Sequence, residues 1–337
     1  MAGKHQHHVW QHIQRGFSVE EYNDNHIWIY TRDSAARKSV TRTYGQQKFF
    51  YGEQNSAADQ NITDLESRLS GLITAARSSK DGAVLDTSLV APLISLLEMR
   101  SAFIRAEMSR MSQRLLEELK KALSSKKSIS ALVKSYLQNH PNFLDDSIKK
   151  LGPNVVDQEL IKLFVEIQMP SLIENASKSL APNLNNAFSL LQKEMADIAK
   201  NSHIKALESD ILNVDRTRLH SLMTYKIARF SKDCLVLPDT GIAFLTENGV
   251  RPLSQKSDRA EIVFIPISSN MMILGSDGPT IDRSIDTINR ILASCSFESF
   301  ISKHISEECK RNAKRIGVNA KLLSDSEIKK ILNLSRI

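Results

Sequence analysis

We predict an α+β fold that is mostly helical, with a small mixed or antiparallel β-sheet built from N-terminal and C-terminal-half strands around a helical middle. β-prone segments lie near both ends of the chain, and apolar residues recur with helical spacing between them. The 337 residues are 41% hydrophobic, which is enough for a sizeable core. We expect four parts: a strand-containing segment, 1–60, packed with 218–302; a helical region, 61–217; a hairpin, sheet and helix region, 218–302; and a basic helical tail, 303–337.

Residues 1–60 are expected to supply strands. Ile27 to Tyr30 is a β-prone run that follows a turn-prone triplet at 23–25, and residues 40–50 are suited to further extended segments. A sheet that joins this block to residues 218–275 brings the two ends of the chain together. Removal of the first 50 residues should then unfold the rest.

The middle of the chain has helical periodicity from Ile62 onward, with Thr63 or Asn61 as the expected cap. One long helix is predicted from Thr87 to Leu123. Breaks that contain proline divide the following stretch into shorter segments. These shorter helices are predicted at 127–139, 143–151, 155–169 and 183–207.

The second half begins with a predicted β-hairpin. Residues 234–237 and 242–245 are apolar, and they flank Pro238-Asp239-Thr240-Gly241, which has the composition of a four-residue turn. Helices are expected to return at about 280–301 and to continue to the end. Further strands are predicted at 222–227, 261–267 and 271–274.

Composition excludes several classes of protein. Three cysteines without a CxxC pair disfavour a disulfide framework and a thiolate zinc site, and they indicate a reducing, cytoplasmic environment. We expect no membrane partner, because the start of the chain has no signal-peptide core and the longest uncharged apolar stretch is too short to span a bilayer. The absence of GxGxxG, GxxxxGK[ST] and GxSxG motifs disfavours Rossmann dehydrogenases, P-loop NTPases and α/β-hydrolases.

The last 35 residues are strongly basic. Lys310, Arg311, Lys314 and Arg315 form a cluster that a helix would place on one side. Such a patch is suited to phosphates, so nucleic acid is one expected partner and a protein is the other. The alternative is a solvated helix face. No aromatic residue lies among these charges, so base stacking is not indicated there.

Histidines are concentrated at the N-terminus. His5, His8 and His12 would share a helical face, whereas His5 and His7 would share a strand face. Three interpretations remain open: a metal site, a structural hydrogen-bonding role, or a catalytic base. Because no HExxH or CxxC motif accompanies these residues, we assign no metal, and the sequence identifies no cofactor.

Three more polar residues stand out by position. Arg100 interrupts the apolar stripe of the long helix, so its charge needs a buried partner or faces a ligand, whereas Arg105 and Arg110 are expected at the surface. Asn289 lies beside an apolar helix face and is either a tie to a strand or a substrate contact. Asp239 is either a turn residue or part of a site.

Short motifs are spread along most of the chain. Near the N-terminus they are His7-His8-Val9-Trp10-Gln11, Arg15-Gly16-Phe17, the strand Ile27 to Tyr30, and the pairs Phe50-Tyr51 and Leu65-Glu66. Later they are the arginine-bearing stretch 100–105, Pro238-Asp239, Pro266-Ile267-Ser268, and Asn289. In this combination the chain resembles the bacterial domain-of-unknown-function family four-two-three-eight, which commonly has proline where Trp10 stands here. The resemblance implies that His7, Gln11, Arg15, Arg100, Asp239 and Asn289 form one constellation.

Two hypotheses for function follow. The first is an enzyme acting on a phosphate-bearing substrate, a nuclease-like hydrolase, with His7 as general acid or base, Asp239 orienting it and Arg100 holding an anion. Gln11, Arg15 and Asn289 are then the substrate-binding residues. The mobile bacterial contexts of the family favour a role as a defence or toxin effector. The second hypothesis is a non-catalytic module that binds nucleic acid or protein.

Overall fold

The computed structural model describes residues 4–21, 24–124, 126–140, 142–143, 146, 158–209, 211–212, 214–254, 259–276 and 284–331. It is 51% helix and 20% strand, and its three small sheets are antiparallel. The predicted α+β class is therefore confirmed.

The chain forms two compact units. Unit 1 comprises residues 1–108 and 199–322, and unit 2 comprises 109–198 and 323–337. The predicted helical region 61–217 is thus divided between the two. Its first part belongs to unit 1 because helices there bury their apolar faces against a sheet.

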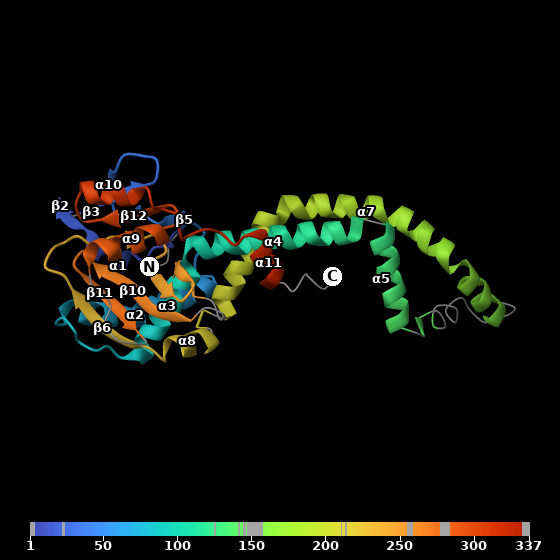
Figure 1. The fold of residues 1–337 in the computed structure, drawn as a ribbon, viewed down its shortest axis with the longest axis horizontal. Coiled ribbons are helices and arrows are strands. Elements are labelled where there is room, and N and C mark those ends of the chain that lie inside the picture. The colour runs from blue at the N-terminus through green and yellow to red at the C-terminus, as the bar shows by residue number, and fades with distance from the viewer. Residues whose placement is uncertain are drawn as a thin grey trace. The chain divides into compact units, whose positions relative to one another are not determined.

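The larger sheet of unit 1 has the order β6-β11-β10-β8-β9, with every neighbouring pair antiparallel. Its central strand β10 is buried along most of its length, and helices α2 (Ala57–Ser78) and α3 (Thr87–Arg100) pack beside the sheet (Figure 1). The strands are β6 (Thr224–Arg229), β8 (Ala243–Thr246), β9 (Gly249–Arg251), β10 (Ala260–Ser268) and β11 (Met271–Ser276).

The second sheet joins the two ends of unit 1, but the strand that pairs with the N-terminal block is at 299–302, outside the predicted range 218–275. Strand β12 (Ser299–Ser302) pairs with one edge of β3 (Asp24–Thr31), and β4 (Arg37–Val40) pairs with the other. The two edges are distinguished at Trp28 of β3, which is opposite Ser302 of β12 and also opposite Lys38 of β4. The sheet is completed by β2 (Val19–Glu21) beside β3 and by β7 (Leu237–Pro238) beside β12. Helices α9 (Ile285–Cys295) and α10 (Glu307–Ala313) pack against it (Figure 1).

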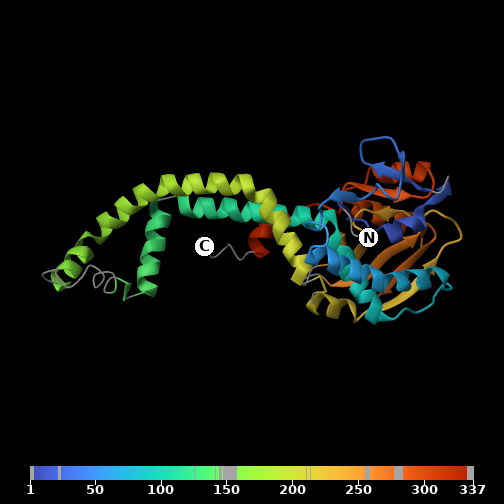
Figure 2. The ribbon, with the colours of Figure 1, turned by 180° about the vertical axis from the view of Figure 1, so that it is seen from behind.

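The third sheet is a two-stranded ribbon at the N-terminus. Strand β1 (His5–His7) pairs antiparallel with β5 (Gln46–Lys48). After β1 the chain turns into the short helix α1 (Gln11–Gln14) and the 3-10 turn η1 (Arg15–Phe17). Figure 2 shows this N-terminal segment from the opposite side, beside helix α2.

The predicted hairpin at residues 234–245 is wrong. The turn forms, with the Gly241 amide donating to the Pro238 carbonyl at 2.9 Å and with Gly241 at φ +75°. However, β7 before it pairs with β12, whereas β8 after it pairs with β9 and β10. The turn therefore carries the chain from one sheet to the other.

The long helix predicted from Thr87 to Leu123 is two helices, α3 and α4 (Ala102–Ser124). Ser101 between them is extended, and its hydroxyl donates to the Glu98 carbonyl and accepts from the Ile104 amide, so it ends one helix and begins the next. A side-chain hydrogen bond of this kind competes with the helical pattern. Helix α2 likewise begins earlier than predicted, with Ser56 as its N-cap.

Other boundaries also differ. The helix predicted at 280–301 ends at Cys295, because the chain then becomes strand β12. Helices 155–169 and 183–207 are one helix, α7 (Gln158–Ser209), which continues through Pro170 and Pro182. Each proline removes a single main-chain hydrogen bond, and the bonds on either side hold the helix together. Helix α8 (Val214–His220) follows it.

Unit 2 is helical. The later part of α4 lies side by side with α7 in both views (Figures 1 and 2), and Phe188 and Met195 of α7 are buried. Helices α5 (Lys126–Asn139) and α11 (Asp325–Ile331) complete it, and Arg114 of α4 forms an ion pair with Asp325. The helix predicted at 143–151 lies almost entirely outside the described residues.

Among the described residues no single helix is long and apolar enough to cross a membrane. Helices α3 and α4 reach the necessary length and composition only when they are taken together across the 55° bend between them.

Candidate functional site

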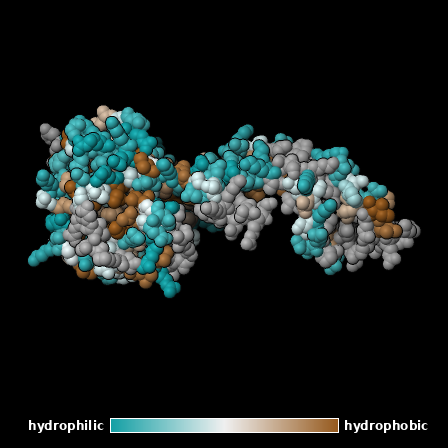
Figure 3. Space-filling model, in the orientation of Figure 1, coloured by the Kyte–Doolittle hydropathy of each residue, from teal (hydrophilic) through white to brown (hydrophobic). Residues whose placement is uncertain are grey.

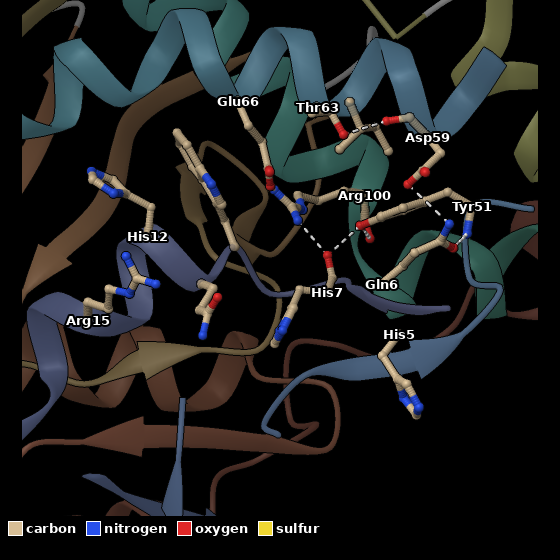
Figure 4. A pocket seen from close by; sticks show the side chains of 13 residues that line it. His5, Gln6, His7, His12, Arg15, Tyr51, Asp59, Thr63, Glu66 and Arg100 are labelled. Carbon is tan, nitrogen blue, oxygen red and sulfur yellow. Dashed lines mark hydrogen bonds and ion pairs between the residues drawn. The ribbon is translucent and has the colours of Figure 1, made fainter. Parts of the chain in front are cut away.

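A pocket of about 260 Å³ opens between the N-terminal segment and helix α2 (Figure 4). Strand β1 and helix α1 form one side, α2 forms another, and the end of α3 closes the floor. Four of the six residues expected to share a site line this pocket: His7, Gln11, Arg15 and Arg100. The remaining polar lining comes from His5, Gln6, His12, Tyr51, Asp59, Thr63 and Glu66.

Arg100 lies at the floor of the pocket, with 1% of its surface exposed. Its guanidinium forms an ion pair with Glu66 and donates a hydrogen bond to the main-chain carbonyl of His7 (Figure 4). Burial lowers the pKa of Arg100, but Glu66 and then Tyr51 more than offset this effect, so its pKa is raised overall. The guanidinium of Arg100 is therefore paired within the protein through Glu66 and His7, while its Nε is buried without a hydrogen-bond partner in the described structure.

The main chain at His7 is fixed by a second donor. The Tyr51 hydroxyl donates to the same His7 carbonyl at 2.7 Å. Burial raises the pKa of Tyr51 to about 12, so this hydroxyl keeps its proton at neutral pH. A carbonyl oxygen has two lone pairs, and here both are used.

The His7 ring has a defined tautomer. Its Nδ1 lies 3.1 Å from the Tyr44 carbonyl oxygen, which can only accept, so Nδ1 carries the proton. Nε2 is then an acceptor, and it forms no hydrogen bond within the described part of the chain. Burial lowers the pKa of His7, the Tyr44 carbonyl raises it, and Arg100 and Arg15 lower it further, with the net shift downward. His7 is therefore a neutral base at pH 7.

Gln6 and Asp59 hold one side of the pocket, and the sequence analysis missed both. The Gln6 amide donates to Asp59 at 3.1 Å and to the Gly52 carbonyl at 3.2 Å, and it accepts from the Tyr51 amide at 2.5 Å. Asp59 is three residues after the N-cap Ser56, a position that by itself indicates helix capping. No pattern in the sequence distinguishes this buried glutamine from the polar residues around it.

The rim of the pocket carries the groups that remain available to a ligand. Arg15 is exposed and has no ion pair or hydrogen bond from its side chain among the described residues. The pKa of His12 is lowered by burial, by Arg77 and by Arg15, and its Nε2 is buried without a partner in the described structure. A cation beside imidazole and amide groups is suited to an oxyanion such as phosphate.

Asp239 lies elsewhere, and the prediction that it orients His7 is wrong. Its carboxylate accepts hydrogen bonds from the amides of Phe297, Glu298 and Ser299 at 2.7, 2.7 and 2.9 Å. These bonds tie the turn after β7 to the start of β12. Burial raises the pKa of Asp239 to about 6, against the lowering effect of the three amides. The nearest link to His7 is indirect, because the Tyr44 hydroxyl bonds Ser299 at 2.9 Å.

Asn289 is also distant from the pocket lining. It is fully buried in α9, where it accepts from the Val236 amide at 3.2 Å and donates to the Cys234 carbonyl at 2.8 Å. It also donates to Glu308 of α10. Asn289 therefore ties helix α9 to the chain that leads into β7, which is the first of the two predicted roles. It does not lie among the residues that line the pocket.

The basic C-terminal cluster does not line the pocket. Lys310 and Arg311 lie in the last turn of α10, which ends at Ala313, so Lys314 and Arg315 follow the helix instead of continuing its face. All four are exposed, and Lys310 pairs with Glu307 at 2.6 Å. Figure 3 shows a hydrophilic surface over α10, β2 and β3. Nucleic-acid binding by this cluster stays a prediction.

The helical arrangement of His5, His8 and His12 does not form, because His5 is in strand β1 and His12 is in α1. Among the residues that the structure describes, no three histidine, cysteine or acidic side chains are grouped so as to hold a metal ion. His8 instead packs its ring on Phe50, and burial, followed by the charge of Arg100, lowers its pKa to about 4.

Arg105 was expected at the surface and is instead partly buried against the core. Its guanidinium lies 3.6 Å from the centre of the Phe50 ring, and its Nε donates to His203 Nδ1 at 3.1 Å. His203 Nε2 in turn bonds the Met99 carbonyl at 2.7 Å. Periodicity within one helix could not reveal this role, because the partners come from α7 and from the loop before α2.

No protein-family model matches the chain, and no curated protein or solved structure shows significant similarity to it. The resemblance noted from the short motifs therefore stays a prediction.

Proposed function

We propose that the chain is an enzyme that acts on a phosphate-bearing substrate, a nuclease-like hydrolase, with His7 as its general base. The observation that supports this best is the His7 ring itself: Nδ1 is held by the Tyr44 carbonyl, the pKa is lowered, and Nε2 forms no hydrogen bond with a described residue, in a residue that lines the pocket. A neutral imidazole in this state can take a proton from an attacking water or hydroxyl.

The other lining residues divide into two groups. Arg15 and Gln11, at the rim, are proposed to bind the phosphate and its ester group. Arg100 and Tyr51 hold the main chain of His7 and so fix the direction of the imidazole. Positioning of this kind contributes to catalysis because a base that is held in place needs no reorganisation when the proton moves. A role in bacterial antiviral defence or as a toxin rests on the family resemblance alone.

The test is cleavage of labelled single- and double-stranded DNA and RNA, with and without divalent metal ions. The variant is His7→Ala, and the matched control is His26→Ala, which removes a histidine from β3 outside the pocket. We expect cleavage by the wild type and the control but not by His7→Ala. Equal cleavage by all three proteins would refute the role of His7.

The second candidate is a non-catalytic module that binds nucleic acid or protein. It is favoured by the ion pair of Arg100 with Glu66 and by the Gln6–Asp59 hydrogen bond, because these polar groups have partners without any ligand. Apolar side chains near the start of α7, at Leu163, Phe164 and Ile167, are 55, 64 and 66% exposed, and such a surface fits a protein partner. Binding of a probe without cleavage would support this candidate.

A further inference from the structure

The N-terminal segment that forms one side of the pocket and the segment that pairs with it through β5 are basic and contain no acidic residue. Residues 4–19 carry two Lys/Arg and residues 34–52 carry four, and neither stretch has an Asp or Glu. All six of these basic side chains are exposed. The chain as a whole has 38 acidic residues and 45 basic ones, so the excess of positive charge on this surface is unusually large.

Three of these cations lie on or beside the β1–β5 ribbon, whose strand β1 lines the pocket. Lys4 immediately precedes β1, Arg42 lies in the turn before β5, and Lys48 ends β5. We call Lys4, Arg42 and Lys48 the basic track. None of their side chains forms an ion pair or a hydrogen bond with another described residue, so their charges are available.

The strand register places the track beside the proposed base. Lys48 is directly opposite His5 in the β1–β5 ribbon, and Gln46 is opposite His7. Paired residues of antiparallel strands point to the same face. Figure 4 shows the rings of His5 and His7 on the same side of their strand, away from Arg100. Lys48 therefore lies on the face that presents His7.

The turn that carries Arg42 is also attached to the site. Its Gly45 carbonyl accepts from the His8 amide at 2.7 Å, and its Tyr44 carbonyl accepts from the Gln14 side chain at 3.2 Å as well as from His7. Gly45 has φ +62° and lies against Val9. The track is thus fixed relative to the His7 ring.

Available cations on the β1–β5 ribbon and its turn, with β1 lining a small polar pocket, match a polyanion of which one unit enters the pocket. Phosphates at regular intervals in a nucleic acid match separate Lys and Arg side chains. A cavity of about 260 Å³ has room for one nucleotide, which a single strand can supply but a stacked and paired duplex cannot supply without unstacking. Gln11 in the lining offers hydrogen-bonding contacts for a base.

We propose that the basic track binds the phosphate backbone of a single-stranded nucleic acid and directs one of its nucleotides into the His7 pocket. This inference rests on the proposed function for the chemistry at His7, whereas the binding surface itself can be tested separately. It assigns nucleic-acid binding to the N-terminal ribbon rather than to the C-terminal cluster.

The experiment measures binding of one labelled 20-nucleotide single-stranded RNA or DNA, and of its duplex, by fluorescence anisotropy at several salt concentrations. The full-length chain with His7→Ala is used so that the probe is not consumed. Into it we introduce Arg42→Glu with Lys48→Glu. The matched control has Arg68→Glu with Lys80→Glu, two exposed cations outside the track with the same change of charge. A third pair, Lys310→Glu with Arg311→Glu, tests the C-terminal cluster.

We expect the track pair to weaken single-strand binding at least tenfold and to lower the salt slope by about 1 to 2, since each phosphate contact on a single strand contributes about 0.7. The control pair and the C-terminal pair should change affinity by less than about threefold, and melting temperatures should be unchanged. Undiminished binding by the track pair would overturn the proposal. So would a loss confined to the C-terminal pair or tighter binding to the duplex.

Cleavage by chains that retain His7 separates this inference from the proposed function. If binding depends on Arg42 and Lys48 but His7→Ala cleaves as well as the wild type, the track stands and the catalytic role of His7 fails. If His7→Ala abolishes cleavage while the track pair binds and cleaves normally, the track fails and the proposed function stands.

Discussion

The guanidinium of Arg100 donates a hydrogen bond to the main-chain carbonyl oxygen of His7, so a buried cation at the end of α3 fixes the strand that carries the proposed base. The contact uses the main chain of residue 7 and not its imidazole. The protein can therefore lose the His7 ring without losing this tie, and that property makes the catalytic role testable by mutation.

Arg100→Met should destabilise the protein strongly. It leaves the Glu66 carboxylate without its partner and the His7 carbonyl with one donor instead of two. Removal of one partner of a buried ion pair costs about 3–5 kcal/mol, and because Glu66 is partly exposed we expect the lower end of that range. Urea denaturation measures the loss. Arg37→Met, at an exposed position in β4, is the control and should change stability by less than about 0.5 kcal/mol.

Gly16→Ala and Gly71→Ala should have opposite effects. A Cβ at residue 16 would collide with the Ile267 carbonyl oxygen and with the Arg77 guanidinium, which bonds that carbonyl at 2.7 Å. A Cβ at residue 71, in the middle of α2, would meet nothing within 4 Å. We expect a loss of about 1–3 kcal/mol at residue 16 and a gain of about 0.5–1 kcal/mol at residue 71. Equal melting temperatures for the two variants would contradict the packing described around η1.

His203 should make the fold sensitive to acid. Burial, followed by the charge of Arg105, lowers its pKa from 6.5 to about 4, although the Met99 carbonyl raises it. As pH falls below 6.5 the unfolded chain binds a proton that the folded chain binds only near pH 4, so the free energy of unfolding decreases over this window. The full shift corresponds to about 3 kcal/mol.

The contribution of His203 is isolated by comparing the wild type with His203→Gln in urea denaturation at pH 7, 5.5 and 4.5. The variant should be less stable at pH 7, because it loses hydrogen bonds, but its stability should fall less between pH 7 and 4.5. Parallel pH curves for the two proteins would show that His203 is already protonated in the fold or does not titrate there.

Asp239→Asn should weaken the junction between β7 and β12. Both carboxylate oxygens accept amide hydrogens, and an asparagine places an NH₂ group where one of those oxygens lies. A donor facing a donor costs about 1–3 kcal/mol. Denaturation should show this loss while cleavage at saturating substrate is retained, because Asp239 does not contact His7. A folded Asp239→Asn protein without cleavage activity would instead show that Asp239 takes part in catalysis.

Sequence patterns predicted the fold class and several of the pocket residues for physical reasons that can be named. Arg100 was identifiable because a charge interrupts an apolar stripe, and such a charge requires a partner wherever the helix packs. Strand β3 was identifiable from Ile27 to Tyr30, whose residue types suit a half-buried sheet. Both signals are local, so one segment is enough to reveal them.

Features that depend on partners distant in sequence could not be predicted. The run before Asp239 is apolar, but whether it pairs with β8 or β12 depends on competition between two sheets. Ser101 ends helix α3 through a hydrogen bond from its hydroxyl to the Glu98 carbonyl. A serine within a helical pattern does not by itself indicate such a break. Gln6 is important because its side chain forms hydrogen bonds with Asp59 and with the Tyr51 amide. The residues next to Gln6 in the sequence do not indicate these contacts.

The most direct test of the central claim is the pH dependence of cleavage by the wild type, measured beside His7→Ala and His26→Ala, with circular dichroism confirming that all three are folded. We expect wild-type activity to rise with pH through a midpoint below 6.5, because the lowered pKa of His7 leaves it neutral above that pH. We also expect His26→Ala to follow the same curve, and His7→Ala to be folded and inactive at every pH. A folded His7→Ala protein that cleaves with the wild-type pH profile would contradict the account.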